Sequence, residues 1–343
     1  MKIIIRNCNV AELDIPLKYA TKLYNEFAIR HPNAFYLRTR QRGMQNWDGK
    51  IKYITKTGQF KIGLLPSVYK RCIELGIKPI IVDMRQPLPK VSKVVTQIGK
   101  YKLRPEQEKA VKAILSNKLG ETPFQIGVLD YTVNAGKTLI MSALYLSYKK
   151  QLKTLLITND SDWLNQARDE FKQYLPGEDI TFVQGKVLNW SNFTIGMVQS
   201  ISRNMKYYQN ELAKIDMVLI DEADQGGSKQ YQNAITRLFN TRVRIGLSGT
   251  IYMSKLAKDK VKNMNLRCFF GDVLAEFKLK DSIKKGYSTK TIVKTVEGKP
   301  WFGNWESDCM SYNEIYDDSI THNKIAWTMA LDKIGRASCR ERV

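Results

Sequence analysis

A short glycine-containing segment, Asn-Ala-Gly-Lys-Thr at residues 134–138, constrains the fold of this chain more than any other feature. It follows an apolar run at 124–129 that is typical of a buried strand, and it precedes a helical pattern at 138–149. A strand, a loop and a helix in this order can hold phosphate, because backbone N–H groups and the helix dipole converge at the helix N-terminus. Tyr131 stands where the general pattern has a first glycine, and Gly-Lys-Thr also begins helices by chance. We nevertheless expect a phosphate-binding loop here.

Two adjacent carboxylates, Asp221 and Glu222, follow a second apolar run at 215–220. They should emerge at the carboxyl end of a strand, the edge at which open α/β sheets bind ligands. Mg²⁺ prefers oxygen ligands and is usually held by one or two carboxylates plus phosphates. We therefore expect Thr138 and Asp221 to hold Mg²⁺, Lys137 to neutralise phosphate oxygens, and Glu222 to orient and deprotonate a water. The alternative is an acidic loop after a strand, which the upstream lysine disfavours.

Two further segments extend the pattern. Ser-Gly-Thr at 248–250 ends another predicted strand, so Ser248 and Thr250 should lie beside the carboxylates and could sense the γ-phosphate. About thirty residues before the loop, Arg104 and Gln107 begin a helical pattern, and the Gln107 amide offers a donor and an acceptor to an adenine edge. Taken alone, the first segment is a strand-end turn and the second a solvated helix start.

From about residue 101 the sequence alternates strands with helices, which indicates an α/β fold with a mainly parallel sheet covered on both faces. We expect strands at 124–129, 154–158, 180–183, 194–198, 217–220 and 244–248, and helices at 138–149, 162–174 and 230–239. Residues 1–84 predict a smaller α/β unit with strands at 3–5, 35–42, 51–55, 60–64 and 78–83 and helices at 17–29 and 66–75.

Net charge favours a polyanionic partner. The chain carries +22, and residues 1–99 hold 18 Lys and Arg against 6 Asp and Glu, a net of +12. In the strand expected at 35–42, Arg38, Arg40 and Arg42 would project to one side, and with Trp47 they suit a surface that follows a nucleic-acid backbone. The alternative is a well-solvated surface.

Together the ordered segments resemble the first RecA-like domain of superfamily 2 helicases. Thr-Asn-Asp-Ser at 158–161, Gln-Ser at 199–200 and Asn-Trp-Asp-Gly-Lys at 46–50 make the chain similar to UvsW-type phage recombination and branch-migration helicases. The literal Asp-Glu-Ala-Asp also occurs in DEAD-box RNA helicases, but their Pro-Thr-Arg-Glu-Leu and Thr-Pro-Gly-Arg segments are missing here.

The resemblance implies a role for each matching residue. ATP and Mg²⁺ would be the cofactors, and duplex or branched DNA the partner, in recombination, repair or replication. Adenine contacts would come from Arg104 and Gln107, and DNA-backbone contacts from Asn159, Gln199 and Ser200. The remaining implied site residues are the phosphate-loop residues Asn134, Ala135, Gly136, Lys137 and Thr138, the catalytic pair Asp221 and Glu222, and the coupling residues Ser248 and Thr250.

We expect five segments: a basic α/β domain at 1–84, a linker at 85–100, an ATP-binding domain at 101–287, a connection at 288–333 and a non-native tail at 334–343. Nothing after 250 resembles a second RecA-like domain, whose arginine fingers accelerate hydrolysis in this family, so we expect a truncated helicase that hydrolyses ATP slowly. No apolar run reaches the ~20 residues of a membrane span, and the separated cysteines suit a cytoplasmic protein, in the host cytoplasm if phage-encoded. Two other classes stay open: the motor subunit of a restriction or repair nuclease, and a non-catalytic DNA-binding module.

Overall fold

The computed structural model describes residues 1–40, 44–91, 93–185, 187–252 and 259–289. Within them, Met1–Ser288 form one unit by their contacts. The connection expected at 288–333, from residue 290 onward, and the tail expected at 334–343 lie outside the described residues. None of the described helices has the length and apolar character that crossing a membrane requires.

The amino-terminal region contains a four-stranded sheet in the order β5-β2-β1-β6. β1 pairs antiparallel with β2 and parallel with β6. Ile3 and Ile5 of β1 are fully buried, which is the period-two burial of a strand with one face on a core. The elements are β1 (Lys2–Ile5), β2 (Val10–Asp14), α1 (Leu17–Glu26), β5 (Gln59–Lys61), the 3₁₀ turn η1 (Ile62–Leu64), α3 (Leu65–Glu74) and β6 (Ile80–Asp83).

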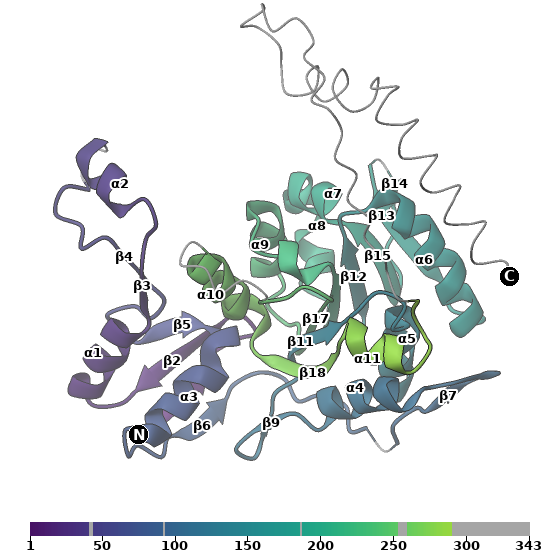
Figure 1. Ribbon diagram of the computed structural model, residues 1–343, viewed down its shortest axis with the longest axis horizontal. Coiled ribbons are helices and arrows are strands. Elements are labelled where there is room, and N and C mark those ends of the chain that lie inside the picture. The colour runs from purple at the N-terminus through teal and green to yellow at the C-terminus, as the bar shows by residue number, and fades with distance from the viewer. Residues whose placement is uncertain (41–43, 92, 186, 253–258, 290–343) are drawn as a thin grey trace, which may run out of the picture. The chain divides into compact units, whose positions relative to one another are not determined.

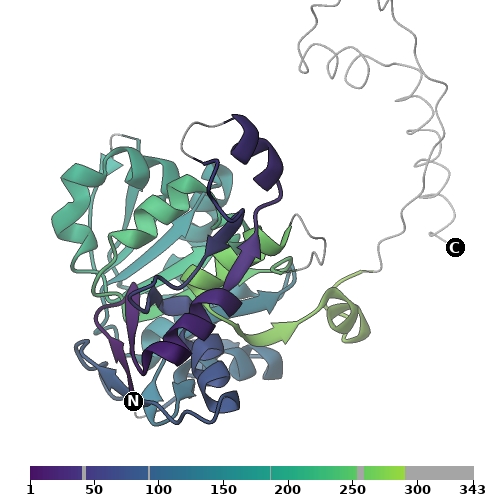
Figure 2. The same cartoon turned by 90° about the vertical axis from the view of Figure 1, so that its left-hand side faces the viewer.

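A two-stranded ribbon, β3 (Ala28–Arg30) with β4 (Lys50–Lys52), carries a short helix, α2 (Ala34–Arg40), at its end (Figures 1 and 2). The strand expected at 35–42 is therefore wrong, and β4 takes β3 as its antiparallel partner. Phe35 and Tyr36 are 81% and 54% exposed, so no buried face holds this segment extended. Arg42 lies outside the described residues.

The larger sheet has eight strands in the order β14-β13-β15-β12-β16-β17-β11-β18. Seven of them run parallel and β14 alone is antiparallel, which confirms the expected α/β class. Its strands are β11 (Ile126–Tyr131), β12 (Thr154–Thr158), β13 (Ile180–Gln184), β14 (Val187–Leu188), β15 (Phe193–Met197), β16 (Met217–Asp221), β17 (Val243–Ser248) and β18 (Val273–Phe277). β18 was not predicted from the sequence. It pairs with β11 and is the last strand in this order.

Helices cover both faces of this sheet (Figure 1). They are α4 (Pro105–Leu115), α5 (Lys137–Ser147), α6 (Ser161–Tyr174), α7 (Val198–Arg203), α8 (Met205–Leu212), α9 (Lys229–Thr236), α10 (Asp259–Phe270) and α11 (Leu279–Lys284). The helices expected at 138–149, 162–174 and 230–239 correspond to α5, α6 and α9. Short hairpins, β7 (Gln97–Ile98) with β8 (Tyr101–Lys102) and β9 (Lys118–Leu119) with β10 (Thr122–Pro123), lie outside the two sheets.

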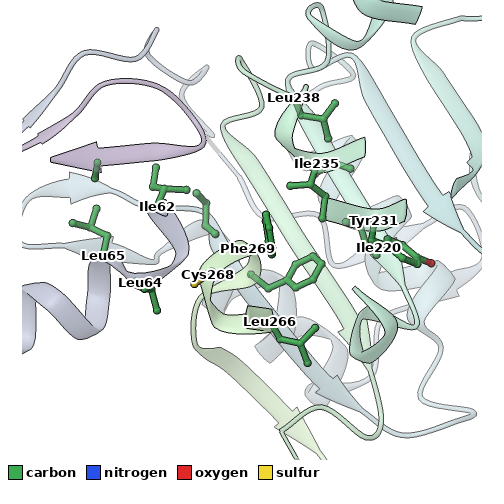
Figure 3. Packing of buried hydrophobic residues seen from close by; sticks show 14 of the residues in the cluster. Ile62, Leu64, Leu65, Ile220, Tyr231, Ile235, Leu238, Leu266, Cys268 and Phe269 are labelled. Atoms are coloured by element: carbon green, nitrogen blue, oxygen red, sulfur yellow. The ribbon is translucent and has the colours of Figure 1, made fainter. Parts of the chain in front are cut away.

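Successive residues of the buried strands contribute to different cores. In β16, Leu219 belongs to the core under α4, α5 and α6, whereas Ile220 belongs to the core under α7, α9 and α10. The second core continues into the amino-terminal region, because Ile62 and Leu64 of η1 belong to the same cluster as Phe269 of α10 (Figure 3). A fully buried arginine of β17, Arg244, joins the same two regions by hydrogen bonds to the carbonyl of Cys8 (2.8 Å) and to Oδ1 of Asn9 (2.7 Å).

Candidate functional site

The segment after β11 forms a loop that opens directly into α5. Two of its residues have left-handed backbone: Asn134 with φ 62° and Gly136 with φ 73°. A Cβ at Gly136 would lie 2.3 Å from Nε2 of Gln107, so any side chain here would both strain the backbone and collide. Lys137 begins α5, and Thr138 in its first turn is only 8% exposed. The predicted strand–loop–helix context is thus present.

The two carboxylates lie at the same edge as this loop. Asp221 ends β16, and the Nζ atom of Lys137 lies 3.1 Å from its Oδ1 and 3.7 Å from Oε1 of Glu222. Asp221 is 5% exposed, and its Oδ1 accepts no hydrogen bond from the described residues. This buried oxygen faces the Lys137 ammonium, and a carboxylate oxygen is also the ligand type that a hard cation such as Mg²⁺ prefers.

Glu222 has an unusual backbone and a perturbed carboxyl group. Its φ of 52° places a non-glycine residue in the left-handed region, which costs free energy and is often found at functional sites. Burial raises the pKa of Glu222, and the neighbouring charges of Asp221 and Asp224 raise it further, while Lys137 opposes them. A carboxyl group with a raised pKa suits proton transfer.

Ser248 ends β17, the strand between β16 and the loop-bearing β11. Its hydroxyl donates to Oδ1 of Asp224 over 2.9 Å and lies 3.3 Å from the Thr250 hydroxyl. The expected proximity of the 248–250 segment to the acidic segment is present, with Asp224 as the contact residue. Asp224 follows in the 3₁₀ turn η2 (Ala223–Gln225), which Glu222 precedes.

Arg104 and Gln107 lie against the loop rather than apart from it. The Gln107 side-chain carbonyl accepts from the backbone N–H of Arg104 (2.9 Å), and its amide donates to the Ala135 carbonyl (2.8 Å). Nη2 of Arg104 donates to the Asn134 carbonyl over 3.1 Å. The side-chain carbonyl and one amide N–H of Gln107 are thus used in hydrogen bonds within the protein. The second amide hydrogen remains for a nucleobase. The adenine role of both residues stays a prediction.

Among the expected DNA-backbone contacts, two lie together and near the acidic segment. The Asn159 amide donates to Oε1 of Gln225 over 2.6 Å, and the Gln199 amide donates to the Asn159 carbonyl over 3.4 Å. Ser200 accepts from the backbone N–H of Gly185 over 2.9 Å. The first two bonds form a polar chain from the start of α7 through the end of β12 to η2.

The described basic residues that were predicted to contact nucleic acid lie on α2 of the amino-terminal region. Arg38 and Arg40 are exposed on α2, and the Arg40 guanidinium lies 4.9 Å from the centroid of the Tyr36 ring. Trp47 is half-buried, and its indole N–H donates to the Lys50 carbonyl over 3.0 Å. The structure thus gives Trp47 a turn-forming role, and its contact with nucleic acid stays a prediction.

Sequence reasoning missed a second group of charges around the loop. Asp130 and Glu106 are buried carboxylates, and they pair with Lys278 and Lys285, two residues from beyond β18. The separations in sequence, 148 and 179 residues, leave no local signal. The one available indication was Asp130, a buried acidic residue near the end of β11, the strand that leads into the loop.

Parallel strands, a glycine loop that opens a helix, and a lysine beside two carboxylates are features that P-loop nucleotide-binding domains share. The comparisons agree with this class. A family model described as "Type III restriction enzyme, res subunit" matches residues 100–253.

Two curated relatives are similar to the chain. "ATP-dependent DNA helicase uvsW" of Enterobacteria phage T4 is 23% identical over 272 residues, 73% of this chain and 51% of that protein. "Putative ATP-dependent RNA helicase L396" of Acanthamoeba polyphaga mimivirus is 25% identical over 147 residues, 43% of this chain and 27% of that protein. The chain thus spans between about a quarter and a half of the curated relatives it matches.

The fold also has a solved counterpart. The crystal structure of the UvsW helicase from bacteriophage T4 superposes with a TM-score of 0.62 at 21% identity, and the match covers 80% of this chain and all of that chain. The chain is thus similar to superfamily 2 helicases of the UvsW type, in sequence over the matched residues and in fold.

Proposed function

We propose that this chain binds Mg²⁺–ATP at the edge of the large sheet and that the protein hydrolyses it to move along or remodel duplex or branched DNA. The observation that carries the proposal is the position of the Lys137 ammonium, 3.1 Å from Asp221 and 3.7 Å from Glu222. A cation and two carboxylates at the end of a glycine loop fit a triphosphate with its metal better than any other ligand.

Each residue has a distinct task in this proposal. Lys137 neutralises phosphate oxygens, and the loop N–H groups approach the phosphates closely because Gly136 has no side chain. Thr138 and Asp221 are the residues that would hold Mg²⁺, which supplies charge neutralisation at the phosphates when bound. Glu222 orients the attacking water and accepts its proton, and its raised pKa keeps it an adequate base.

Charge and the relatives' names support a nucleic-acid substrate. The net charge is +22, and α2 exposes Arg38 and Arg40. One relative is named a DNA helicase and the other an RNA helicase. We favour duplex or branched DNA, in recombination, repair or replication, because the DNA helicase matches the larger share of this chain. Such a protein would act in the cytoplasm, in an infected host if phage-encoded.

A second candidate is the motor subunit of a restriction nuclease, which the description of the matching family model favours. A metal-dependent nuclease needs a cluster of ligands in addition to the ATP site. Over the part of the chain that the structure describes, no three His, Cys, Asp or Glu residues gather to hold a metal ion. Incubating the protein with supercoiled and linear DNA and ATP tests this candidate directly.

Nucleotide binding and DNA-dependent hydrolysis test the main proposal. We expect fluorescently labelled ATP to bind in the presence of Mg²⁺, Lys137→Ala to abolish binding, and Glu222→Gln to retain binding while hydrolysis falls by about 10²–10³. Duplex DNA, a branched junction and duplex RNA of equal length then identify the stimulating partner. Unimpaired binding by Lys137→Ala would refute the assigned site, and stimulation by RNA alone would refute the assigned substrate.

A further inference from the structure

The segment 273–288, which we call the strap, lies beside the phosphate loop although it follows that loop by about 140 residues in sequence. Its strand β18 pairs with β11, with Phe277 opposite Tyr131. Lys278 pairs with buried Asp130, and Nζ of Lys285 lies 2.7 Å from Oε2 of buried Glu106. Two ion pairs and a strand pairing therefore hold the strap against the start of the loop and the start of α4.

Tyr287, near the end of the strap, contacts Arg104. The guanidinium carbon of Arg104 lies 4.3 Å from the centroid of the Tyr287 ring, a distance typical of a stacked cation and aromatic ring. Tyr287 is 37% exposed, and its backbone N–H donates to the Ser282 carbonyl over 2.9 Å, which fixes the turn after α11.

Arg104 is held on several sides. Its Nη2 atom donates to the Asn134 carbonyl over 3.1 Å, and its Nε atom lies 3.4 Å from Oε1 of Glu106. Both contacts are made through nitrogen atoms at the edge of the guanidinium. The Tyr287 ring adds a contact of another kind, and an aromatic ring stacked on this planar group restrains its orientation.

We propose that Tyr287 is a positioning residue of the adenine subsite: it orients the Arg104 guanidinium for the nucleobase. The inference rests on the proposed function, since it deepens the same site. A flexible arginine loses rotamer freedom when it binds a ligand, and prior stacking removes part of that loss. The strap thereby contributes to recognition of the base and not to recognition of the phosphates, which lie with Lys137.

Competition binding distinguishes recognition of the base from recognition of the phosphates. Unlabelled ATP and inorganic tripolyphosphate, each with Mg²⁺, displace fluorescently labelled ATP from the protein. We expect Tyr287→Ala to weaken ATP about fivefold, the size of a partly exposed cation–π contact, and to leave tripolyphosphate unchanged. Tyr287→Phe keeps the ring and should retain ATP affinity, whereas Tyr287→Leu keeps only bulk and should behave like the alanine variant.

Two further variants complete the test. Tyr207→Ala removes an equally large ring, 84% exposed on α8, and should change neither affinity. Arg104→Ala should weaken ATP, and adding Tyr287→Ala to it should cost nothing more, because the two residues act as one unit. Full additivity, an equal loss of ATP and tripolyphosphate in Tyr287→Leu, or no loss at all would overturn the inference. Unimpaired binding of both ligands by Lys137→Ala would instead refute the proposed function.

Discussion

The hydroxyl of Ser248 donates a hydrogen bond of 2.9 Å to the carboxylate of Asp224. The two residues follow adjacent parallel strands, β17 and β16, and Asp224 lies two residues after the proposed catalytic Glu222. Gln225, the next residue, accepts the hydrogen bond from Asn159. These contacts link the acidic segment after β16 to the ends of β17 and β12, and we propose that they transmit a change at the nucleotide.

The first prediction concerns this contact. Ser248→Ala should leave ATP affinity and basal hydrolysis within a few-fold of the wild type while DNA stimulation falls about tenfold, as expected for the loss of a coupling contact. Hydrolysis rates with and without duplex DNA measure the effect. Ser116→Ala, at the end of α4, is the matched control and should keep full stimulation. Equal losses of basal and stimulated rates would show that Ser248 serves the chemical step instead.

The second prediction concerns pH. Glu222 must be ionised to accept a proton, and burial together with Asp221 and Asp224 raises its pKa. Hydrolysis should therefore decline on acidification at a higher pH than an ordinary glutamate, whose pKa is about 4.3, would dictate. Asp224→Asn removes one of the raising charges, so the acid limb of its pH–rate profile should move to lower pH. An unmoved limb, or one moved upward, would contradict the assignment of Glu222 as the base.

The third prediction concerns the buried contact between the two regions of the unit. Asn9→Ala removes the hydrogen bond to the fully buried Arg244 and a second one to the Thr236 carbonyl (3.0 Å). Because a buried charged donor then lacks an acceptor, the free energy of unfolding should fall by about 2–3 kcal/mol. Urea denaturation measures the change, and Asn210→Ala on the exposed side of α8 should stay within about 0.5 kcal/mol. A similarly small effect of Asn9→Ala would mean that water replaces the lost acceptor.

The fourth prediction concerns α2. Arg38→Ala and Arg40→Ala should each weaken duplex DNA binding and reduce the slope of log affinity against log salt by about 0.9 if each contacts one phosphate. Fluorescence anisotropy over a salt series gives both quantities. Lys70→Ala on α3 removes the same charge from an exposed position and serves as the control. If all three variants behave alike, only net charge matters and α2 is not the contact surface.

Much of the larger sheet could be predicted because each of its central strands is a fully buried apolar run. Residues 217–220 have this pattern, as do residues 245–247 within the strand predicted at 244–248, and the structure contains β16 and β17 at these positions. The strand end also determines where Asp221 emerges, so its proximity to Lys137 followed from parallel topology alone. Local patterns determine such a site whenever each residue ends a buried strand or begins a helix.

The wrong and missed elements lie where the pattern of buried residues does not indicate a strand or a helix. In 34–40, arginines at alternate positions indicated a strand, but the same residues are compatible with a helix when both faces are exposed. β18 is half-exposed, and its place beside β11 depends on pairing across about 145 residues. The contact of Tyr287 with Arg104 follows from that pairing and therefore could not be predicted before it.

The position of β18 also affects how the chain folds during synthesis. β11 lies between β17 and β18, so the strand that leads into the phosphate loop keeps an unpaired edge until residues 273–277 have left the ribosome. Domains fold as units and amino-terminal segments emerge first, so this edge stays open while about 145 further residues are synthesised. An open apolar strand edge invites pairing with other chains. Production of this protein should therefore depend on chaperones until the sheet is closed.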